Sequence, residues 1–171
     1  MDKINLLYVY RQRVPLKLRE LVLNFIPEDE FAIKMMNYSE PVENQKEYMR
    51  WAEVVLFAPG RRLSSEVMEA AKNVKLMQLW SSGFDKFNIE DSIKFGIPVA
   101  NNGGGNAISV AEHTLLLMLS VCKWLPDSHS RAVEGRWEGN SHGIDMLLLH
   151  KKILGIIGFG NIGREVAKRA K

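Results

Sequence analysis

The residues with the clearest chemical meaning form a glycine pattern near the end of the chain. Gly158, Gly160 and Gly163 make up the spacing G-x-G-x-x-G within GFGNIG. In a nucleotide-binding turn of this kind the first glycine allows a tight turn, the second lets the backbone approach a pyrophosphate, and the third lets a helix pack closely on a strand. The N–H groups of Asn161 and Ile162 would then face phosphate oxygens at the positive end of the helix dipole. The spacing predicts a dinucleotide-phosphate site, and a purely structural strand-turn-helix is the alternative.

The segments on either side of this pattern are those that a nucleotide-binding turn requires. KKILGIIG precedes it and predicts a strand over 153–157, and NIGREVAKRA follows it as an amphipathic helix. The acidic residue that binds the adenosine ribose normally lies about 20 residues beyond the motif. Lys171 comes 8 residues after Gly163. We therefore expect the phosphate-binding turn without the ribose site, as in a βαβαβ unit cut after its first strand and helix.

The first hundred residues show an alternation of short β-rich and helical segments. This order is typical of βαβ units and predicts a mainly parallel sheet with helices on both faces, in a flavodoxin-like α/β domain. The expected strands are 4–10, 31–36, 53–59, 75–81 and 97–102, and the expected helices are 15–25, 43–51, 64–73 and 89–95.

Two of these helices have recognisable ends. Ser64 or Ser65 can cap the third helix, on which Val67, Met68 and Ala71 share one face. Gly96 is a suitable residue to stop the fourth helix before the next strand.

The character of the sequence changes at NNGGGN, residues 101–106, which is interpreted as a hinge, a plain linker or a binding loop. The helix expected over 107–124 is apolar on nearly every side from Leu115 to Leu119. Such a helix is buried, either centrally in a domain or under a partner subunit. A further helix is expected over 127–134.

Composition indicates a soluble globular protein with no nucleic-acid or membrane partner. The chain is 46% apolar and 25% charged, with a formal net charge of +3. Polar residues interrupt the most apolar segment, 107–125, so it is too short to span a membrane. No secretory signal is recognisable at the N-terminus, and the single cysteine, Cys122, is expected to be a small core residue. We therefore expect a cytoplasmic protein.

Several motifs occur in an order that resembles one enzyme family. SSGFDKFNIEDSIKFGIPVANNGGGNAISVAEHTLLLMLSVCK, residues 81–123, contains a Gly-Phe-Asp turn, the strand GIPVAN and the helix start VAEH. LGIIGFGNIGREVAKRA follows it at 154–170. Together they resemble the D-isomer-specific 2-hydroxyacid dehydrogenases, the group with D-3-phosphoglycerate dehydrogenase and glyoxylate/hydroxypyruvate reductase. The resemblance covers the whole chain and is clearest from about residue 53.

The resemblance implies that the chain contains parts of two domains with different roles. Residues 1–101 would be the substrate domain, and 102–171 would be an incomplete N-terminal part of a Rossmann NAD-binding domain. A homodimer would form through the helix at 107–124.

The resemblance also implies contacts with the ligands. The backbone amides of Ser82 and Gly83 would hold the substrate carboxylate, although Gly83 could simply permit a tight strand exit. Val110 would lie near the nicotinamide. The adjoining loop departs from the family pattern, with Gly103 where proline is common.

The implied activity is hydride transfer between NAD and a D-2-hydroxy acid or 2-keto acid, and NADP is left open. The family's catalytic arginine, glutamate and histidine come after the glycine motif and would lie beyond residue 171. We therefore assign no catalytic residue and expect this piece to be inactive by itself. The alternative is a nucleotide-sensing regulatory protein, similar to corepressors, on the same scaffold.

The remaining polar residues receive structural interpretations. Glu112, expected in the first turn of its helix, suits the helix dipole, and the adjacent His113 points elsewhere. The other histidines are scattered, so no metal site is expected; they are His129, His142 and His150. Four arginines could meet an anionic substrate such as a phosphate ester or could be ordinary surface residues; they are Arg11, Arg13, Arg61 and Arg62.

Overall fold

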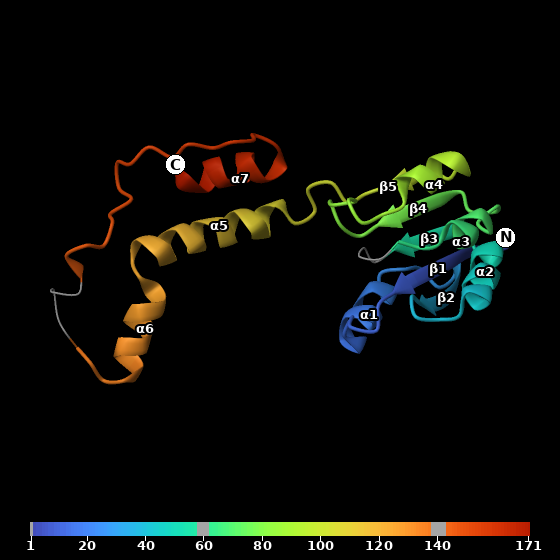
Figure 1. The fold of residues 1–171 in the computed structure, drawn as a ribbon, viewed down its shortest axis with the longest axis horizontal. Helices are drawn as coiled ribbons and strands as arrows, with labels where there is room; N and C mark the ends of the chain where they lie inside the picture. Colours follow the sequence, from blue (N-terminus) through green and yellow to red (C-terminus); the bar gives the residue numbers. More distant parts are fainter. Residues whose placement is uncertain (1, 58–61, 138–142) are drawn as a thin grey trace. The chain divides into compact units, whose positions relative to one another are not determined.

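The structure, a computed structural model, describes residues 2–57, 62–137 and 143–171. Arg61, His142 and the last two residues of the predicted third strand lie outside these ranges. The chain divides into two compact units, Met1–Gly103 and Gly104–Lys171. Figure 1 shows the elements of each unit, and the two units are described separately.

The first unit is built on a five-stranded parallel sheet with the order β2-β1-β3-β4-β5. In register, Leu6 of β1 pairs with Ile33 of β2 and with Val54 of β3. The predicted strands are confirmed, although β5 is only two residues long. The strands are β1 (Ile4–Tyr10), β2 (Phe31–Asn37), β3 (Val54–Phe57), β4 (Leu76–Leu79) and β5 (Val99–Ala100).

Four helices connect these strands. The β1–β2 crossover runs along the sheet in the opposite direction to the other three, so right-handed connections place α1 on one face and the other helices on the opposite face. All four predicted helices are confirmed, but α3 ends four residues earlier than expected. The helices are α1 (Leu16–Leu23), α2 (Val42–Trp51), α3 (Ser65–Glu69) and α4 (Ile89–Lys94).

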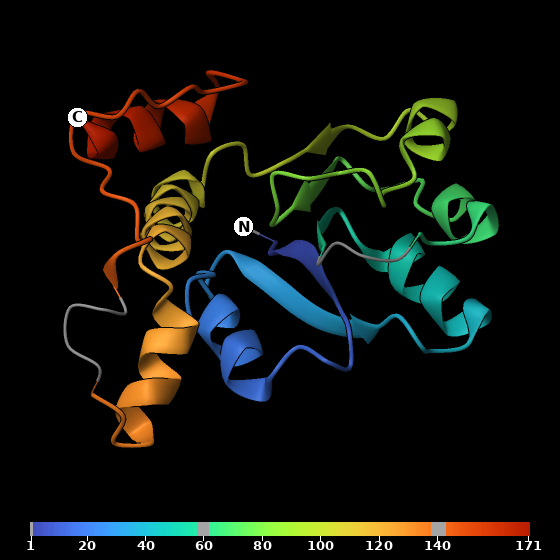
Figure 2. The same ribbon diagram turned by 60° about the vertical axis from the view of Figure 1, so that its left-hand side comes forward.

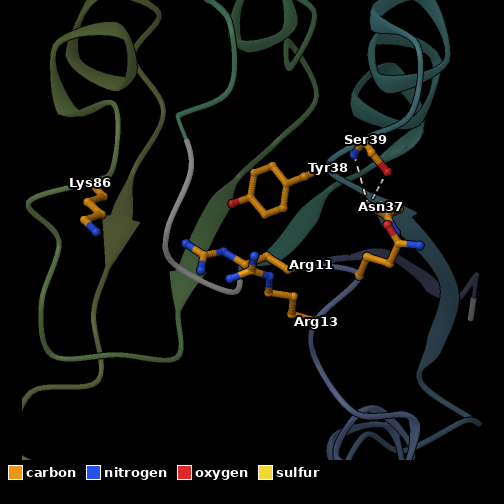
Figure 3. Close-up of a pocket in the computed structure, with 7 residues that line it drawn as sticks. Arg11, Arg13, Asn37, Tyr38, Ser39 and Lys86 are labelled. Atoms are coloured by element: carbon orange, nitrogen blue, oxygen red, sulfur yellow. Dashed lines mark hydrogen bonds between the residues drawn. The ribbon is translucent and has the colours of Figure 1, made fainter.

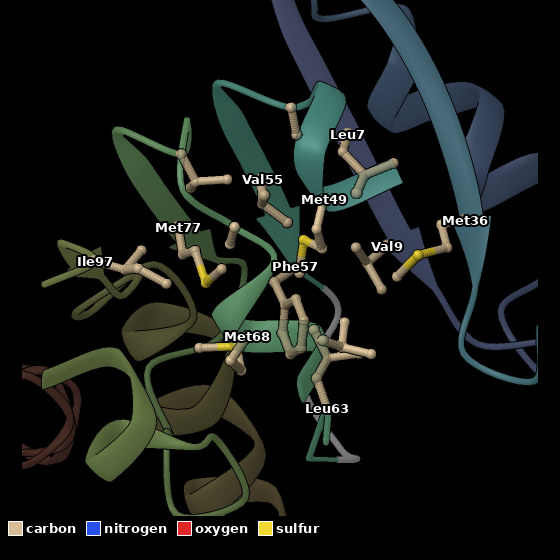
Figure 4. Close-up of a cluster of buried hydrophobic side chains, with 14 of the residues drawn as sticks. Leu7, Val9, Met36, Met49, Val55, Phe57, Leu63, Met68, Met77 and Ile97 are labelled. Atoms are coloured by element: carbon tan, nitrogen blue, oxygen red, sulfur yellow. The ribbon is translucent and has the colours of Figure 1, made fainter. Parts of the chain in front are cut away.

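The core fills the space between the sheet and α2, α3 and α4, as Figure 4 shows. Because successive strand residues point to opposite faces, Leu7 and Val9 join this cluster. Leu6 and Tyr8 are buried outside that cluster. Val67, Met68 and Ala71 are all buried, as their shared helix face predicts. Long, flexible methionine side chains fill much of the cluster; they are Met36, Met49, Met68 and Met77.

The helix ends differ partly from expectation. Ser64 occupies the N-cap position of α3, but no capping bond is made by its side chain. The Ser65 hydroxyl bonds instead to Asp91 Oδ1 of α4 at 3.0 Å, so it ties two helices together. Gly96, at φ 68°, adopts the left-handed conformation that ends α4.

The second unit contains α5 (Ala107–Cys122), α6 (Leu125–Val133) and α7 (Asn161–Ala170). Figures 1 and 2 both show α5 and α7 side by side. Glu112 of α5 lies 3.5 Å from Arg169 of α7, which joins the two helices. The chain turns between α5 and α6 at Trp124, whose φ of 49° is left-handed.

The prediction of a strand over 153–157 is wrong for this chain. Those residues are irregular, and the described part of the second unit contains no strand. A β-strand needs the backbone of a second strand for its hydrogen bonds. Without such a partner the segment leaves Ile153 and Ile157 fully exposed, at 100% and 106% of their reference areas.

The prediction that α5 is buried is also wrong within this chain. Ala107 and Ala111 are its only buried residues, whereas Leu116, Leu117 and Leu119 are each about half exposed. Cys122 is half-buried rather than in a core. The sequence left a partner subunit as the second explanation for this apolar surface, and that explanation remains a proposal.

Among the described residues, every individual helix falls short of the length and apolarity that a membrane crossing needs. The bent pair α5 and α6 passes the same test by length and composition when its two helices, which meet at 67°, are joined.

Candidate functional site

The glycine turn before α7 has the backbone geometry that each of its glycines requires. Gly158 has φ 89°, a left-handed conformation that residues with side chains rarely adopt. A Cβ atom on Gly163 would lie 2.3 Å from the carbonyl oxygen of Gly158. No heavy atom lies within 4 Å of the corresponding Cβ position on Gly160. The turn is therefore closed against its own helix at Gly163 and open at Gly160.

The open side of this turn presents backbone donors. Gly160 is the N-cap of α7, and the N–H of Arg164 donates to its carbonyl oxygen at 3.1 Å. The N–H groups of Asn161 and Ile162 precede that first helical bond, so they have no acceptor within the helix. They lie at the positive end of the helix dipole, which favours an anion.

The start of α5 lies against the same turn. Gly104 has φ 87°, and a Cβ there would lie 2.9 Å from the Asn161 side-chain nitrogen. Arg164 donates to the side-chain oxygen of Asn161 at 3.2 Å, so this amide is held between the glycine loop and α7. Val110, on the first turn of α5, is half-buried, and its carbonyl oxygen accepts a bond from the Thr114 hydroxyl. The structure thus brings the N-terminal ends of α5 and α7 together.

The turn after β4 is tied to the strand exit after β5. The Ser82 hydroxyl donates to the carbonyl oxygen of Asn102 at 2.6 Å. The Asn101 side chain donates back to the carbonyl oxygen of Ser82 at 2.8 Å. Ser81 donates its hydroxyl to the carbonyl oxygen of Gly83 at 2.6 Å. These bonds fix the carbonyl groups of the turn. The sequence did not reveal the part that Asn101 and Asn102 play in it.

Gly83 is not required for the tight strand exit that the sequence left open as its role. Its φ lies outside the left-handed region, and a Cβ would make only an ordinary contact, 3.7 Å from Asp85. Its N–H donates to no acceptor in the part of the chain that the structure describes. The turn can therefore offer a backbone donor, and the side chain nearest to the Gly83 Cβ position is that of Asp85.

Glu112 does not lie in the first turn of α5, contrary to expectation. The helix begins at Ala107, and its first turn contains no acidic residue. Glu112 instead faces Arg169, which also pairs with Glu165 on its own helix. His113 is exposed. Within the described ranges, no three histidine, cysteine or acidic side chains are grouped in a way that could hold a metal ion.

The ion pairs along α7 give the carboxyl group of Glu165 an unusual acidity. The hydrogen bond from Lys168, at 2.6 Å, and then that from Arg169 lower the pKa of Glu165 below its ordinary value of 4.5. A lowered folded-state pKa contributes stability that is present above the unfolded value and is lost as pH falls through the folded value. The pairing of α7 therefore weakens on acidification below pH 4.5.

Lys168→Gln is expected to raise the pKa of Glu165 toward its ordinary value, because it removes the largest cause of the shift. A carboxyl-carbon NMR titration of the chain measures this directly. Lys171→Gln, which removes a lysine charge outside these pairs, is the matched control. An unchanged Glu165 titration in Lys168→Gln would contradict the assigned pairing.

Comparison with known proteins finds similarity to one enzyme family along most of the chain. The family model of the D-isomer specific 2-hydroxyacid dehydrogenase catalytic domain matches residues 12–169. D-3-phosphoglycerate dehydrogenase of Archaeoglobus fulgidus is 38% identical over 120 residues, which cover 70% of this chain and 22% of that protein. Hydroxypyruvate reductase of Thermotoga maritima is 32% identical over 154 residues, covering 84% of this chain and 49% of that protein.

Solved structures show the same similarity. The structure of D-lactate dehydrogenase from Aquifex aeolicus, complexed with NAD and lactic acid, superposes with a TM-score of 0.73 at 25% identity. The superposition covers 97% of this chain and 48% of that one. The chain thus spans half or less of the length of the relatives it matches. It belongs to the family of D-isomer specific 2-hydroxyacid dehydrogenases.

Proposed function

We propose that this chain supplies two of the binding elements of an NAD-dependent oxidoreductase. The enzyme would transfer a hydride between the nicotinamide of NAD and a D-2-hydroxy acid or its 2-keto acid. The observation that carries this proposal is the glycine turn, whose left-handed Gly158 and closely packed Gly163 meet the demands of a dinucleotide-binding motif. Family membership, and the relatives named as dehydrogenases and reductases, support the same reaction class.

In this proposal the second unit holds the cofactor phosphates. The N–H groups of Asn161 and Ile162 donate to the pyrophosphate, which approaches over the open side of Gly160. Val110, at the start of α5, lies toward the nicotinamide. When bound, NAD accepts or supplies the hydride. The similar D-lactate dehydrogenase of Aquifex aeolicus was solved in complex with NAD, which favours NAD as the cofactor here.

The first unit would hold the substrate. The backbone N–H groups of Ser82 and Gly83 bind the carboxylate, and the bonds from Asn101 and Ser81 keep the carbonyl groups of the turn directed away from it. Residues 1–101 then form the substrate domain, and 102–171 form part of the NAD-binding domain. The half-exposed leucines of α5 would pack against a second copy of the chain in a homodimer.

The direct test is to express the whole reading frame that encodes this chain and to follow NADH oxidation with a panel of 2-keto acids. Turnover with glyoxylate, hydroxypyruvate or a related acid is expected. A protein that folds and binds NADH but reduces no acid in the panel would contradict the enzymatic function. That result would favour the nucleotide-sensing alternative, for which no relative reported above provides support.

A substitution at Gly83 tests the carboxylate turn. In the whole protein, Gly83→Ala is expected to reduce kcat/KM for the keto acid by about 10- to 100-fold, because a methyl group obstructs a charge-assisted hydrogen bond worth about 1.5–3 kcal/mol. The thermal midpoint should stay unchanged, since the methyl fits the fold. Gly143→Ala, also free of close neighbours, is the control. Equal kinetics for the two variants would exclude Gly83 from the site.

A further inference from the structure

Asn102 and Gly103 form the only Asn-Gly pair in the sequence, shortly after β5. Both residues are exposed, and Asn102 lies outside any helix, strand or turn. In such a pair the backbone nitrogen of the glycine can attack the side-chain carbonyl carbon of the asparagine, because glycine has no Cβ atom to obstruct the approach. The two residues therefore place a nucleophile beside an electrophile where water has access.

The backbone nitrogen of Gly103 is available for this attack, since its N–H donates to no acceptor among the residues that the structure describes. The preceding asparagine, Asn101, provides a contrast. The nitrogen that would attack its side chain belongs to Asn102 and already donates to the carbonyl oxygen of Ser81 at 3.1 Å. Of these two adjacent asparagines, Asn102 is therefore the one that faces an unengaged backbone nitrogen.

The peptide group between Asn102 and Gly103 is also activated by a hydroxyl group. Ser82 Oγ donates to the carbonyl oxygen of Asn102 at 2.6 Å, at the short end of the range for such bonds. This oxygen belongs to the same amide as the Gly103 nitrogen, so it takes up negative charge when that nitrogen loses its proton. A donor aimed at an oxygen on which charge develops stabilises that charge. Ser82 therefore makes the Gly103 nitrogen a better nucleophile.

One contact of the Asn102 side chain opposes the reaction. Its Nδ2 atom donates to the carbonyl oxygen of Trp80 at 3.2 Å, and this bond must break as ammonia leaves. The bond joins neutral groups and lies at the long end of the N–H···O range. The bond from Ser82 gains strength as charge develops, and charge-assisted hydrogen bonds are about twice as strong as neutral ones. The balance of the two contacts therefore favours reaction at Asn102.

We propose that Asn102 is a site of spontaneous deamidation and that the Ser82 hydroxyl promotes it. Hydroxide or a buffer base removes the amide proton of Gly103, and the nitrogen forms a bond to Cγ of Asn102, which closes a succinimide ring. The bond from Cγ to Nδ2 breaks, and a proton from water completes the ammonia that leaves. Water then opens the ring, and nothing is oxidised or reduced.

Ser82 also directs the opening of the ring. The carbonyl group that it contacts is the main-chain carbonyl of Asn102, which becomes one of the two imide carbonyls. A hydrogen bond to a carbonyl oxygen stabilises the tetrahedral intermediate that forms there, so water attacks this carbonyl in preference to the other. The main product is therefore isoaspartate at position 102. It carries a new negative charge and lengthens the backbone by one carbon atom.

The test is to incubate the folded chain in warm neutral buffer and to map its peptides by mass spectrometry. We expect the residue at position 102 to gain the mass difference between O and NH, while Asn101 in the same peptide stays intact. Fragmentation of the peptide separates the two positions. Enzymatic methylation, which is specific for isoaspartate, identifies the main product.

Gly103→Ala should slow the reaction at least about tenfold, because the methyl group obstructs the attack. The fold should tolerate this change, since the Cβ would make an ordinary contact, 3.7 Å from the Asn101 side chain. This variant shows that Gly103 supplies the nucleophile, whatever its neighbours contribute.

Ser82→Ala tests the contribution of the hydroxyl group. It should slow deamidation about tenfold in the folded chain, the effect of losing a hydrogen bond to a developing charge. In urea, where the contact with Asn102 is absent, it should have no effect. Ser81→Ala is the matched control, because that hydroxyl bonds to the Gly83 carbonyl oxygen instead, and it should leave the rate unchanged.

Three results would overturn the proposal. In the first, Asn102 stays unmodified in the folded chain. In the second, Asn101 reacts as fast as Asn102. In the third, Ser82→Ala and Ser81→Ala react at the same rate, which would show that the Asn-Gly sequence alone determines the reaction. The reaction needs no ligand, so these results do not depend on the proposed function.

Discussion

Gly163→Ala is expected to disrupt the glycine turn and abolish binding of a dinucleotide phosphate. The added Cβ would lie 2.3 Å from the Gly158 carbonyl oxygen, closer than real Cβ atoms approach any heavy atom. The obstacle is backbone, which cannot move aside as a flexible side chain can. Overpacking of this kind costs about 1–3 kcal/mol, and it must displace the start of α7 from the turn.

The direction of the change in α7 stability distinguishes this close contact from the usual effect of replacing a helical glycine. Alanine is favoured over glycine in helices by about 1 kcal/mol, so Gly163→Ala would stabilise α7 if the close contact did not exist. Amide hydrogen exchange along α7, with NADH binding in the whole protein, measures both effects. Faster exchange and lost binding are expected, whereas slower exchange would contradict the packing at Gly158.

Gly160→Ala is the matched control. Its Cβ would meet nothing within 4 Å, so exchange along α7 should accelerate far less than in Gly163→Ala, by no more than the preference for glycine over alanine at an N-cap causes. Binding of NADH should still weaken, because the methyl group occupies the space through which the proposed pyrophosphate approaches. The pair therefore separates a glycine needed for packing from one needed for ligand approach.

The first unit could be predicted from sequence because its signals are local. The continuous apolar run of β1 and the shared face of Val67, Met68 and Ala71 are patterns within one element. The predicted ends of the helices and strands were less accurate, because contacts with other elements determine where an element ends. Ser65, for example, bonds to Asp91 of α4 instead of capping its own helix.

The second unit shows what local patterns cannot determine. The segment 153–157 has the composition of a buried strand, but a strand exists only when another backbone pairs with it. The apolar residues of α5 correctly indicate a surface that avoids water, yet the sequence does not say what covers it. In each case the missing information lies in residues other than those that carry the pattern.

Some residues of the candidate sites could be predicted from the sequence, and others could not. The glycine spacing identified Gly158 and Gly163, because each has a backbone role that only glycine fills easily, and it identified Gly160 through its proposed role in ligand approach. The contact between Gly104 and Asn161 joins residues 57 positions apart, so no short motif contains it. The pocket lined by Arg11, Arg13, Tyr38 and Lys86 (Figure 3) likewise draws on three separate connections of the sheet. Individual arginines were visible in the sequence, but their convergence was not.

Phe57→Ala is expected to cause the largest loss of stability in the first unit. Phe57 is 1% exposed, and its ring meets those of Tyr38 and Phe87 edge-on, each with centroids 5.3 Å apart. Replacing a buried phenylalanine with alanine costs about 3–5 kcal/mol, a large share of the 5–15 kcal/mol that stabilises a domain. Urea unfolding followed by fluorescence measures the loss. Phe25→Ala, at a side chain 80% exposed, should cost far less.

The same ring packs against the loop that carries the proposed carboxylate turn, so a milder substitution should affect the site before it affects the fold. Tyr38 directly follows β2, and Phe87 lies near the end of the loop that carries Gly83. Phe57→Leu retains most of the volume and should cost less than Phe57→Ala, but it removes both edge-on contacts, each worth about 0.5–1.5 kcal/mol. Because those contacts hold the loop, amide exchange over 81–87 should accelerate while exchange in β1 stays unchanged. Uniform acceleration across the sheet would instead show that Phe57 stabilises the core alone and does not position the site.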